Sequence, residues 1–403
     1  MGELKKNVLT KPISTNYSKI LNRKKQNISI LCTSLASGGA EKVISLLLKE
    51  LKNDFNVSLV LFYEDVHFPI PEEVKVIFLN NKKSNRSKFL KLLDPVVFTH
   101  RYHKLIKKEN ISISVSFLAF PNLVNGVIAM LNKKRTTIIS ERGFPSDNTS
   151  SRTSFYISKL FYPILYNRCD KLFSNSEHIN SDLKENFGVK IPMEVIYNPI
   201  EIPKKTIIPE TLNTETPVLK LITAGTLNKR KNQIMVIRAI ENTNRNYQFT
   251  ILGSGNLKEY LNEEIASKKL EKNIVLKGRV KNVNEHLLNN ECFVLSSFTE
   301  GFPNALLEAM AMGLPSVSTN CLSGPLELLN NNETVNIKNG EFYIAKYGLL
   351  VNNDDHIGLS KALEYFRLNP LERQKYSALS LERAKEYHLD TIYSKFKKFI
   401  TNY

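Results

Sequence analysis

The chain has few cysteines, and they are far apart. Only four occur among 403 residues, and no two of them form a C-x-x-C pair: Cys32, Cys169, Cys292 and Cys321. A disulfide framework or a zinc site would need cysteines in closer sets, so this spacing argues against both. We therefore expect a protein of the reducing cytoplasm.

The sequence also lacks a clear export signal or membrane span. The first 27 residues are polar and basic, without the apolar core of a secretory signal. Residues 111–132 carry no charge and are about long enough to cross a bilayer, but Pro121, Gly126, asparagines and serines interrupt them. Alternation over 111–117 indicates a strand, and 122–131 indicates a helix. We predict no transmembrane span.

Acidic residues are outnumbered by basic ones. The 56 Lys and Arg exceed the 39 Asp and Glu, for a net charge of +17, and residues 1–200 alone hold 30 basic and 17 acidic residues. Two stretches carry much of this excess: a tail over 1–26, and the segment 82–108, where cations alternate with apolar side chains. The second pattern suits an anionic lipid surface, and it also suits a solvated helix with an ordinary core face.

Strands, loops and helices follow one another in two series. Apolar runs predict strands in the first series at 28–33, 57–62, 74–78, 111–117, 136–140 and 171–175. The second series has them at 218–223, 249–252, 274–277, 292–295 and 316–318, and only helices are expected after residue 355. Such alternation predicts parallel sheets covered by helices on both faces.

The length of 403 residues fits two domains. We predict an α/β protein of two doubly wound, Rossmann-like domains that face each other across a cleft, since ligands bind beyond the carboxyl ends of parallel strands. The predicted parts are a basic tail over 1–26, a first domain over 27–200, a linker over 201–217, a second domain over 218–380 and a C-terminal helix over 381–403 that returns to the first domain.

Residues 296–315 are the most informative segment of the chain. They are typical of a strand end, a loop, a helix and a glycine stop before the next strand. Pro303 suits the first helical turn, and Gly313 suits the end of the helix. The free amides of Gly301, Phe302 and Asn304 would then form an anion site, strengthened by the helix dipole.

Two glutamates flank this predicted anion site. Glu300 precedes it, and Glu308 lies about 7–8 Å further along the helix. A carboxylate accepts two hydroxyl hydrogen bonds, as a ribose diol offers, so a phosphate held between them would have a sugar on one side and a nucleoside on the other. Taken alone, such a pair also suits solvated surface charge.

This segment resembles the E-x7-E motif of the family 4 retaining glycosyltransferases, which adopt the GT-B fold. Further segments resemble that family in the same order, so the resemblance runs from about residue 28 to residue 400. They are the glycine-rich loop 37–41, the loop 140–145 of members that build bacterial surface glycans, the domain end 195–199, the phosphate loop 225–232 and the late loop 323–327.

The resemblance implies roles for individual residues. Glu308 would bind the ribose, Glu300 the donor sugar, and Lys231 the diphosphate leaving group, whose growing negative charge a cation stabilises. Loop and helix residues would complete the donor site: Gly38, Gly39, Thr226, Arg230, Gly253, Gly301, Phe302, Pro303, Asn304 and Leu307. In the first domain, Glu141 and Arg142 would bind the acceptor.

The chain departs from the family pattern at two places. Thr226 stands where many relatives have an arginine after the glycine, and either Arg230 or Lys229 could replace that cation. The region 117–120 lacks the histidine that many relatives carry in the first domain, so we assign no catalytic histidine.

The resemblance implies a transferase that moves a hexose or N-acetylhexosamine from a UDP-sugar, with retention, to a lipid-linked glycan in bacterial surface polysaccharide synthesis. We expect no cofactor and no divalent metal, because no D-x-D motif accompanies the site. The basic N-terminal half would hold the enzyme at the inner face of the cell membrane. The alternatives are a soluble or protein acceptor, and a basic nucleic-acid-binding protein, for which no binding motif is present.

Overall fold

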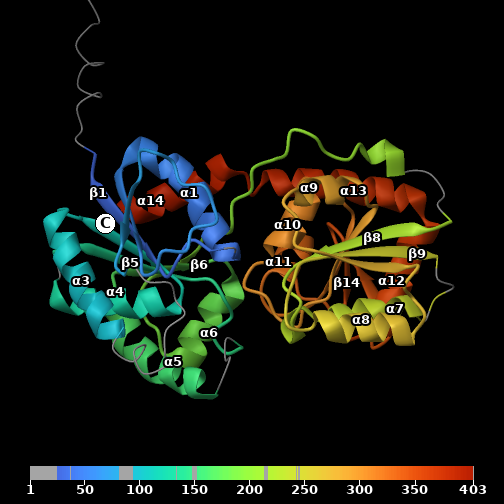
Figure 1. Ribbon diagram of the computed structural model, residues 1–403, viewed down its shortest axis with the longest axis horizontal. Helices are drawn as coiled ribbons and strands as arrows, with labels where there is room; N and C mark the ends of the chain where they lie inside the picture. Colours follow the sequence, from blue (N-terminus) through green and yellow to red (C-terminus); the bar gives the residue numbers. More distant parts are fainter. Residues whose placement is uncertain are drawn as a thin grey trace, which may run out of the picture.

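The computed structural model describes residues 25–402 except 37, 81–93, 133, 148–151, 213–216, 242 and 244–245. The tail over 1–24 and the basic residues 82–93 therefore lie outside the described residues. The described chain forms two α/β domains that lie side by side (Figure 1). This arrangement confirms the predicted fold class.

The first domain is built on a parallel sheet with the strand order β3-β2-β1-β4-β5-β6-β7 in the part of the chain described. Its strands are β1 (Asn27–Cys32), β2 (Asn56–Leu61), β3 (Lys75–Phe78), β4 (Ile113–Phe117), β5 (Thr136–Glu141), β6 (Lys171–Ser174) and β7 (Met193–Val195). The central strands are buried along nearly their whole length, because helices cover both faces.

The helices of this domain are α1 (Gly39–Asp54), α3 (Asp94–Lys108), α4 (Ala119–Leu131), α5 (Arg152–Leu165) and α6 (Glu177–Phe187), with a 3-10 turn η1 (Tyr166–Arg168) after α5. Residues of α1 share one core with the sheet. The helices α3, α4, α5 and α6 supply two other cores, which pack α3 against α4, and α4 against α5 and α6. The described basic helix α3 thus has an ordinary core face.

The second domain has a sheet in the order β10-β9-β8-β11-β12-β14-β13, in which β13 alone among the described strands runs antiparallel to its neighbour. Its strands are β8 (Leu219–Ala224), β9 (Tyr247–Leu252), β10 (Ile274–Gly278), β11 (Cys292–Leu295), β12 (Ser316–Thr319), β13 (Phe342–Ile344) and β14 (Leu349–Val351). The sequence did not predict β7, β13 and β14, since each has three residues and no long apolar run.

The helices of the second domain are α7 (Gln233–Glu241), α8 (Lys258–Ser267), α9 (Val283–Leu288), α10 (Asn304–Ala311), α11 (Pro325–Asn330), α12 (His356–Leu368) and α13 (Pro370–Lys385), with 3-10 turns η2 (Pro209–Leu212) and η3 (Lys229–Lys231). The predicted linker is partly packed: Ile207 and Leu212 are buried in a core of this domain.

The last helix, α14 (Leu389–Thr401), returns to the first domain, as predicted (Figure 1). Ile392, Phe396 and Ile400 join the core beside α1, and Lys397 donates to Asp54 at 2.6 Å. The prediction of a single helix over 381–403 is wrong, however. The chain breaks at 386–388, where the backbone pairs with Ile200 as both segments cross between the domains.

Candidate active site

A cavity of about 630 Å³ lies between the two domains. Its lining follows the carboxyl ends of the strands: from the first domain the segments after β1, β2, β4, β5, β6 and β7, and from the second domain the segments after β8, β10 and β11. This is where parallel sheets bind ligands, because loops and helix N-termini meet there. The fold therefore places the predicted motifs of both domains around one site.

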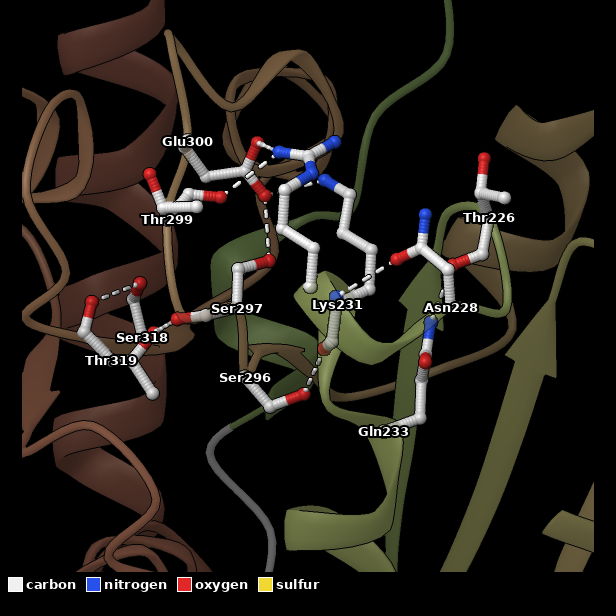
Figure 2. A network of polar contacts seen from close by, with 11 residues as sticks. Thr226, Asn228, Lys231, Gln233, Ser296, Ser297, Thr299, Glu300, Ser318 and Thr319 are labelled. Carbon is white, nitrogen blue, oxygen red and sulfur yellow. Dashed lines mark hydrogen bonds and ion pairs between the residues drawn. The ribbon is translucent and has the colours of Figure 1, made fainter. Parts of the chain in front are cut away.

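On the second-domain side, η3 carries Lys231 into the cavity. The Asn228 side chain caps this turn by accepting from the Lys231 amide at 3.1 Å, and Ser296 Oγ donates to the Lys231 carbonyl at 2.9 Å. These bonds tie the turn to the end of β11. Figure 2 shows the result: Lys231 and Glu300 point toward one another from two neighbouring loops, and Lys231 Nζ forms an ion pair with Glu300 Oε1.

Glu300 is a buried carboxylate with 5% of its surface exposed. It accepts from Ser297 Oγ at 2.6 Å and from Arg230 Nη1 at 3.2 Å, in addition to Lys231. Burial raises the pKa of Glu300, but the charges of Lys231 and Arg230 outweigh it, so the pKa lies below its ordinary value. Glu300 is ionised at neutral pH, and its single negative charge lies beside the positive charges of Lys231 and Arg230.

Arg230 supplies the second cation that Thr226 leaves missing. It lines the cavity and contacts Glu300, whereas Lys229 lies outside the lining, although both side chains are exposed. Both residues belong to the same 3-10 turn, so their different directions follow from their positions around it.

The helix α10 begins at Asn304, with Pro303 as its N-cap, and ends before Gly313, whose φ is +84°. Its first amides have no intrahelical acceptor. The Asn304 side chain joins the domains, because it donates to the Gly39 carbonyl at 3.0 Å and accepts from Asn198. At Gly301 the domains are so close that a Cβ would stand 2.1 Å from the Arg142 carbonyl oxygen.

Glu308 also lines the cavity, and it forms an ion pair of 2.7 Å with Lys42 of the first domain. A lysine thus pairs with the carboxylate that the sequence analysis assigned to a ribose. This contact joins residues 266 positions apart, so no local pattern predicted it.

The first domain contributes Arg142 to the cavity. Its guanidinium lies over the rings of Phe117 and Phe173 and donates to Asn198 Oδ1 at 2.5 Å, while its Nε has no hydrogen-bond partner. Burial lowers the pKa of Arg142 to about 9, which leaves it charged at neutral pH. A buried cation that has no ion pair among the described residues is suited to bind an anion.

Glu141 does not share this position. It is 1% exposed, lies outside the cavity lining and accepts from the Tyr166 hydroxyl at 2.9 Å. Burial raises its pKa to about 7. The structure therefore separates two residues that the sequence paired: Arg142 faces the cavity, and Glu141 supports it from inside the domain.

Most of the other predicted donor residues meet at the cavity: Gly38, Gly39, Thr226, Gly301, Phe302, Asn304 and Glu308. Three do not line it. Gly253 packs against the Gly225 carbonyl, where a Cβ would be 1.8 Å away, so it supports the loop after β8. Leu307 is buried in a hydrophobic core, and Pro303 caps the helix.

Among the lining residues to which the sequence reasoning gave no role are Glu41, Lys42 and Asn198. Glu41 and Lys42 follow the glycine pair in the first turn of α1, at the carboxyl end of β1, and that position was a usable signal. Burial raises the pKa of Glu41. Asn198 follows the short strand β7, which the sequence did not reveal.

No described helix combines the length and the apolar composition needed to cross a bilayer. Within the same residues, no three of the His, Cys, Asp and Glu side chains lie close enough together to hold a metal ion.

Both halves of the chain match family models. Residues 37–203 match the model described as Glycosyltransferase Family 4, and residues 204–380 match the one described as Glycosyl transferases group 1. Among solved structures, Anabaena HepE in complex with UDP and glucose aligns with a TM-score of 0.72 at 15% identity, over 93% of this chain and 99% of HepE. The apo form of the lipopolysaccharide outer core galactosyltransferase WaaB aligns with a TM-score of 0.70 at 19% identity, over 93% and 99% of the two chains.

Two enzymes of Campylobacter jejuni resemble the chain along nearly its whole length. The N-acetylgalactosamine-N,N'-diacetylbacillosaminyl-diphospho-undecaprenol 4-alpha-N-acetylgalactosaminyltransferase is 30% identical over 90% of this chain and 96% of its own. A GalNAc-alpha-(1->4)-GalNAc-alpha-(1->3)-diNAcBac-PP-undecaprenol alpha-1,4-N-acetyl-D-galactosaminyltransferase is 25% identical over 93% and 98%. With these likenesses and the matching family models, the chain belongs to the family 4 glycosyltransferases with the GT-B fold.

Proposed function

We propose that the protein transfers a hexose or N-acetylhexosamine from a UDP-sugar, with retention of the anomeric configuration, to a lipid-linked glycan of a bacterial surface polysaccharide. The names of the two Campylobacter relatives describe transfer to glycans on diphospho-undecaprenol. A structural neighbour, HepE, holds UDP and glucose. These likenesses support the proposed classes of donor and acceptor. The residues that would bind them line the cavity between the domains.

The observation that carries the proposal is the set of charges around the start of α10. Lys231 and Arg230 both contact the single carboxylate of Glu300, so this end of the cavity has a spare positive charge. The first amides of α10 add a partial positive charge beside it. A diphosphate placed there would be neutralised, with the ribose reaching Glu308 and the sugar reaching Glu300.

The chemistry follows from how Glu300 is held. Because Lys231, Arg230 and Ser297 all donate to it, and its pKa is lowered, Glu300 is a poor nucleophile and a poor base. We propose that Glu300 accepts hydrogen bonds from the donor sugar. The bond between the anomeric carbon and the β-phosphate oxygen breaks, and the electron pair stays on the phosphate, which Lys231 stabilises. The acceptor oxygen bonds on the same face and gives its proton to the leaving phosphate.

The acceptor would enter from the first domain. Arg142 lines the cavity with a guanidinium whose Nε has no hydrogen-bond partner among the described residues, and a guanidinium suits the diphosphate of a lipid-linked glycan. We place the enzyme at the inner face of the cell membrane, held there by the basic N-terminal half.

The test is incubation with a panel of UDP-, GDP- and other nucleotide sugars, with released nucleotide as the readout. We expect turnover with a UDP-hexose or UDP-N-acetylhexosamine, and a product whose anomeric coupling in NMR matches that of the donor. Release of a nucleotide other than UDP, or an inverted product, would overturn the corresponding part of the proposal. Parallel reactions with an undecaprenyl-diphosphate glycan, the free glycan and a protein distinguish the acceptor classes.

A further inference from the structure

The outer face of α5 carries five large apolar side chains that are 40–67% exposed: Tyr156, Ile157, Leu160, Phe161 and Ile164. We call them the α5 face. They recur at the spacing of one side of a helix, so they form one continuous strip. Single exposed apolar residues are ordinary on protein surfaces, whereas a strip of five on one helix indicates an interaction surface.

The orientation of α5 is fixed by its inner side. Tyr162 stacks on Tyr166 with ring centroids 4.1 Å apart, and Phe155 contacts the Phe187 ring of α6 at 5.9 Å. Near its end, Leu165 lies against Gly126 of α4, where a Cβ would be 2.6 Å from the Leu165 carbonyl oxygen. The helix cannot rotate to bury the α5 face without breaking these contacts.

The charges around this face select its partner. The sequence of α5 contains no Asp or Glu, and exposed Lys159 lies beside the strip with its ammonium over the Phe155 ring. Basic α3, on the same side of the sheet with α4 between them, adds exposed Arg101, Lys104 and Lys107 (Figure 1). Aromatic and aliphatic side chains flanked by cations are the composition of surfaces that enter an anionic lipid interface.

The α5 face is also connected to the cavity. Phe144 and Asp147 line the cavity, and α5 begins only five residues after Asp147 in the sequence. An acceptor anchored in a bilayer at this face would therefore meet the loop that holds Arg142.

We propose that the α5 face is the membrane-docking surface, and that its side chains insert into the headgroup region of an anionic bilayer while α3 contacts the lipid phosphates. This rests on the proposed function, because a lipid-linked acceptor is the reason for docking. In this proposal α5 inserts into the bilayer, whereas the sequence alone indicated only that the basic segments contact it.

Direct insertion is measurable because the chain has no tryptophan. In F161W the single indole would lie on the α5 face, and its emission should move to shorter wavelength on addition of phosphatidylglycerol–phosphatidylethanolamine vesicles, with quenching by brominated lipid tails. L371W is the matched control, because Leu371 is 66% exposed on α13 of the second domain. Its emission should not change. An unchanged F161W spectrum with vesicle-bound protein would overturn the assignment to α5.

The second test removes the apolar strip. L160E with I164E should lower vesicle binding in co-sedimentation by about tenfold per residue, whereas L371E should bind like the wild type. UDP-sugar turnover on a water-soluble acceptor should be kept by both variants, and this separates failed docking from a failed proposed function. Wild-type protein that stays in the supernatant, or a wild-type dimer that L160E with I164E makes monomeric, would show that a bilayer is not the partner of this face.

Discussion

Replacing Lys231 with alanine tests the centre of the proposed mechanism. The Lys231–Glu300 pair is 15% and 6% exposed in its two side chains, so the substitution leaves a buried carboxylate with Arg230 at 3.2 Å and Ser297 at 2.6 Å. Breaking a fully buried pair costs about 3–5 kcal/mol, and the two remaining partners reduce this to about 1–2 kcal/mol of stability. The pKa of Glu300 should rise, because one of its two cations is gone.

The loss in catalysis should exceed the loss in stability. A group that stabilises charge only as the leaving group departs contributes about 10²–10³ in kcat, or about 3–4 kcal/mol. The assay is UDP release at saturating donor, with urea unfolding of the same variant. K229A is the matched control, because Lys229 lies in the same 3-10 turn with the same charge but is exposed and outside the cavity lining.

Three results would refute this reasoning. K229A could lower kcat as much as K231A, which would show that the effect depends on the total positive charge of the turn and not on the position of Lys231. K231A could raise KM alone, which would mean that the lysine binds donor and transition state equally. A kcat reduced less than about tenfold would remove Lys231 from the leaving group.

The remaining predictions concern the ribose, the buried carboxyl and the metal. Glu308→Ala should weaken UDP binding by about 1–3 kcal/mol in calorimetry, while Lys42→Ala, which frees the same carboxylate, should not weaken it; equal losses would remove Glu308 from the ribose role. Glu141 has a folded pKa of about 7 against an ordinary 4.5, so the folded state holds a proton that the unfolded state releases. Stability should therefore fall as pH rises from about 4.5 to about 7 and then stay level, and Glu141→Gln should gain at most about 3 kcal/mol relative to wild type between these limits. Equal stability differences at pH 5 and pH 8 would contradict that pKa. Turnover should persist in EDTA, and its complete loss there would show that a divalent cation is needed.

The sequence alone was sufficient for the fold class and for the local arrangement of residues 300–308. Alternating strands and helices define two parallel sheets, because each element needs only its own apolar pattern. Glu300, Gly301, Asn304 and Glu308 belong to one loop and one helix, so their order in the chain nearly fixes their order in space. Gly313 was likewise predictable, because it comes just after α10 in the sequence.

Only the tertiary structure decided which distant side chains complete the site. Arg230 rather than Lys229 reaches Glu300 across 70 positions, and Lys42 meets Glu308 across 266, because separate strands end at one edge. Glu141 accepts a hydrogen bond from Tyr166 inside the domain, while Arg142, the next residue, lines the cavity. Local periodicity specifies which side of an element is apolar; which charges then face each other depends on how the two sheets and the returning helix α14 are packed.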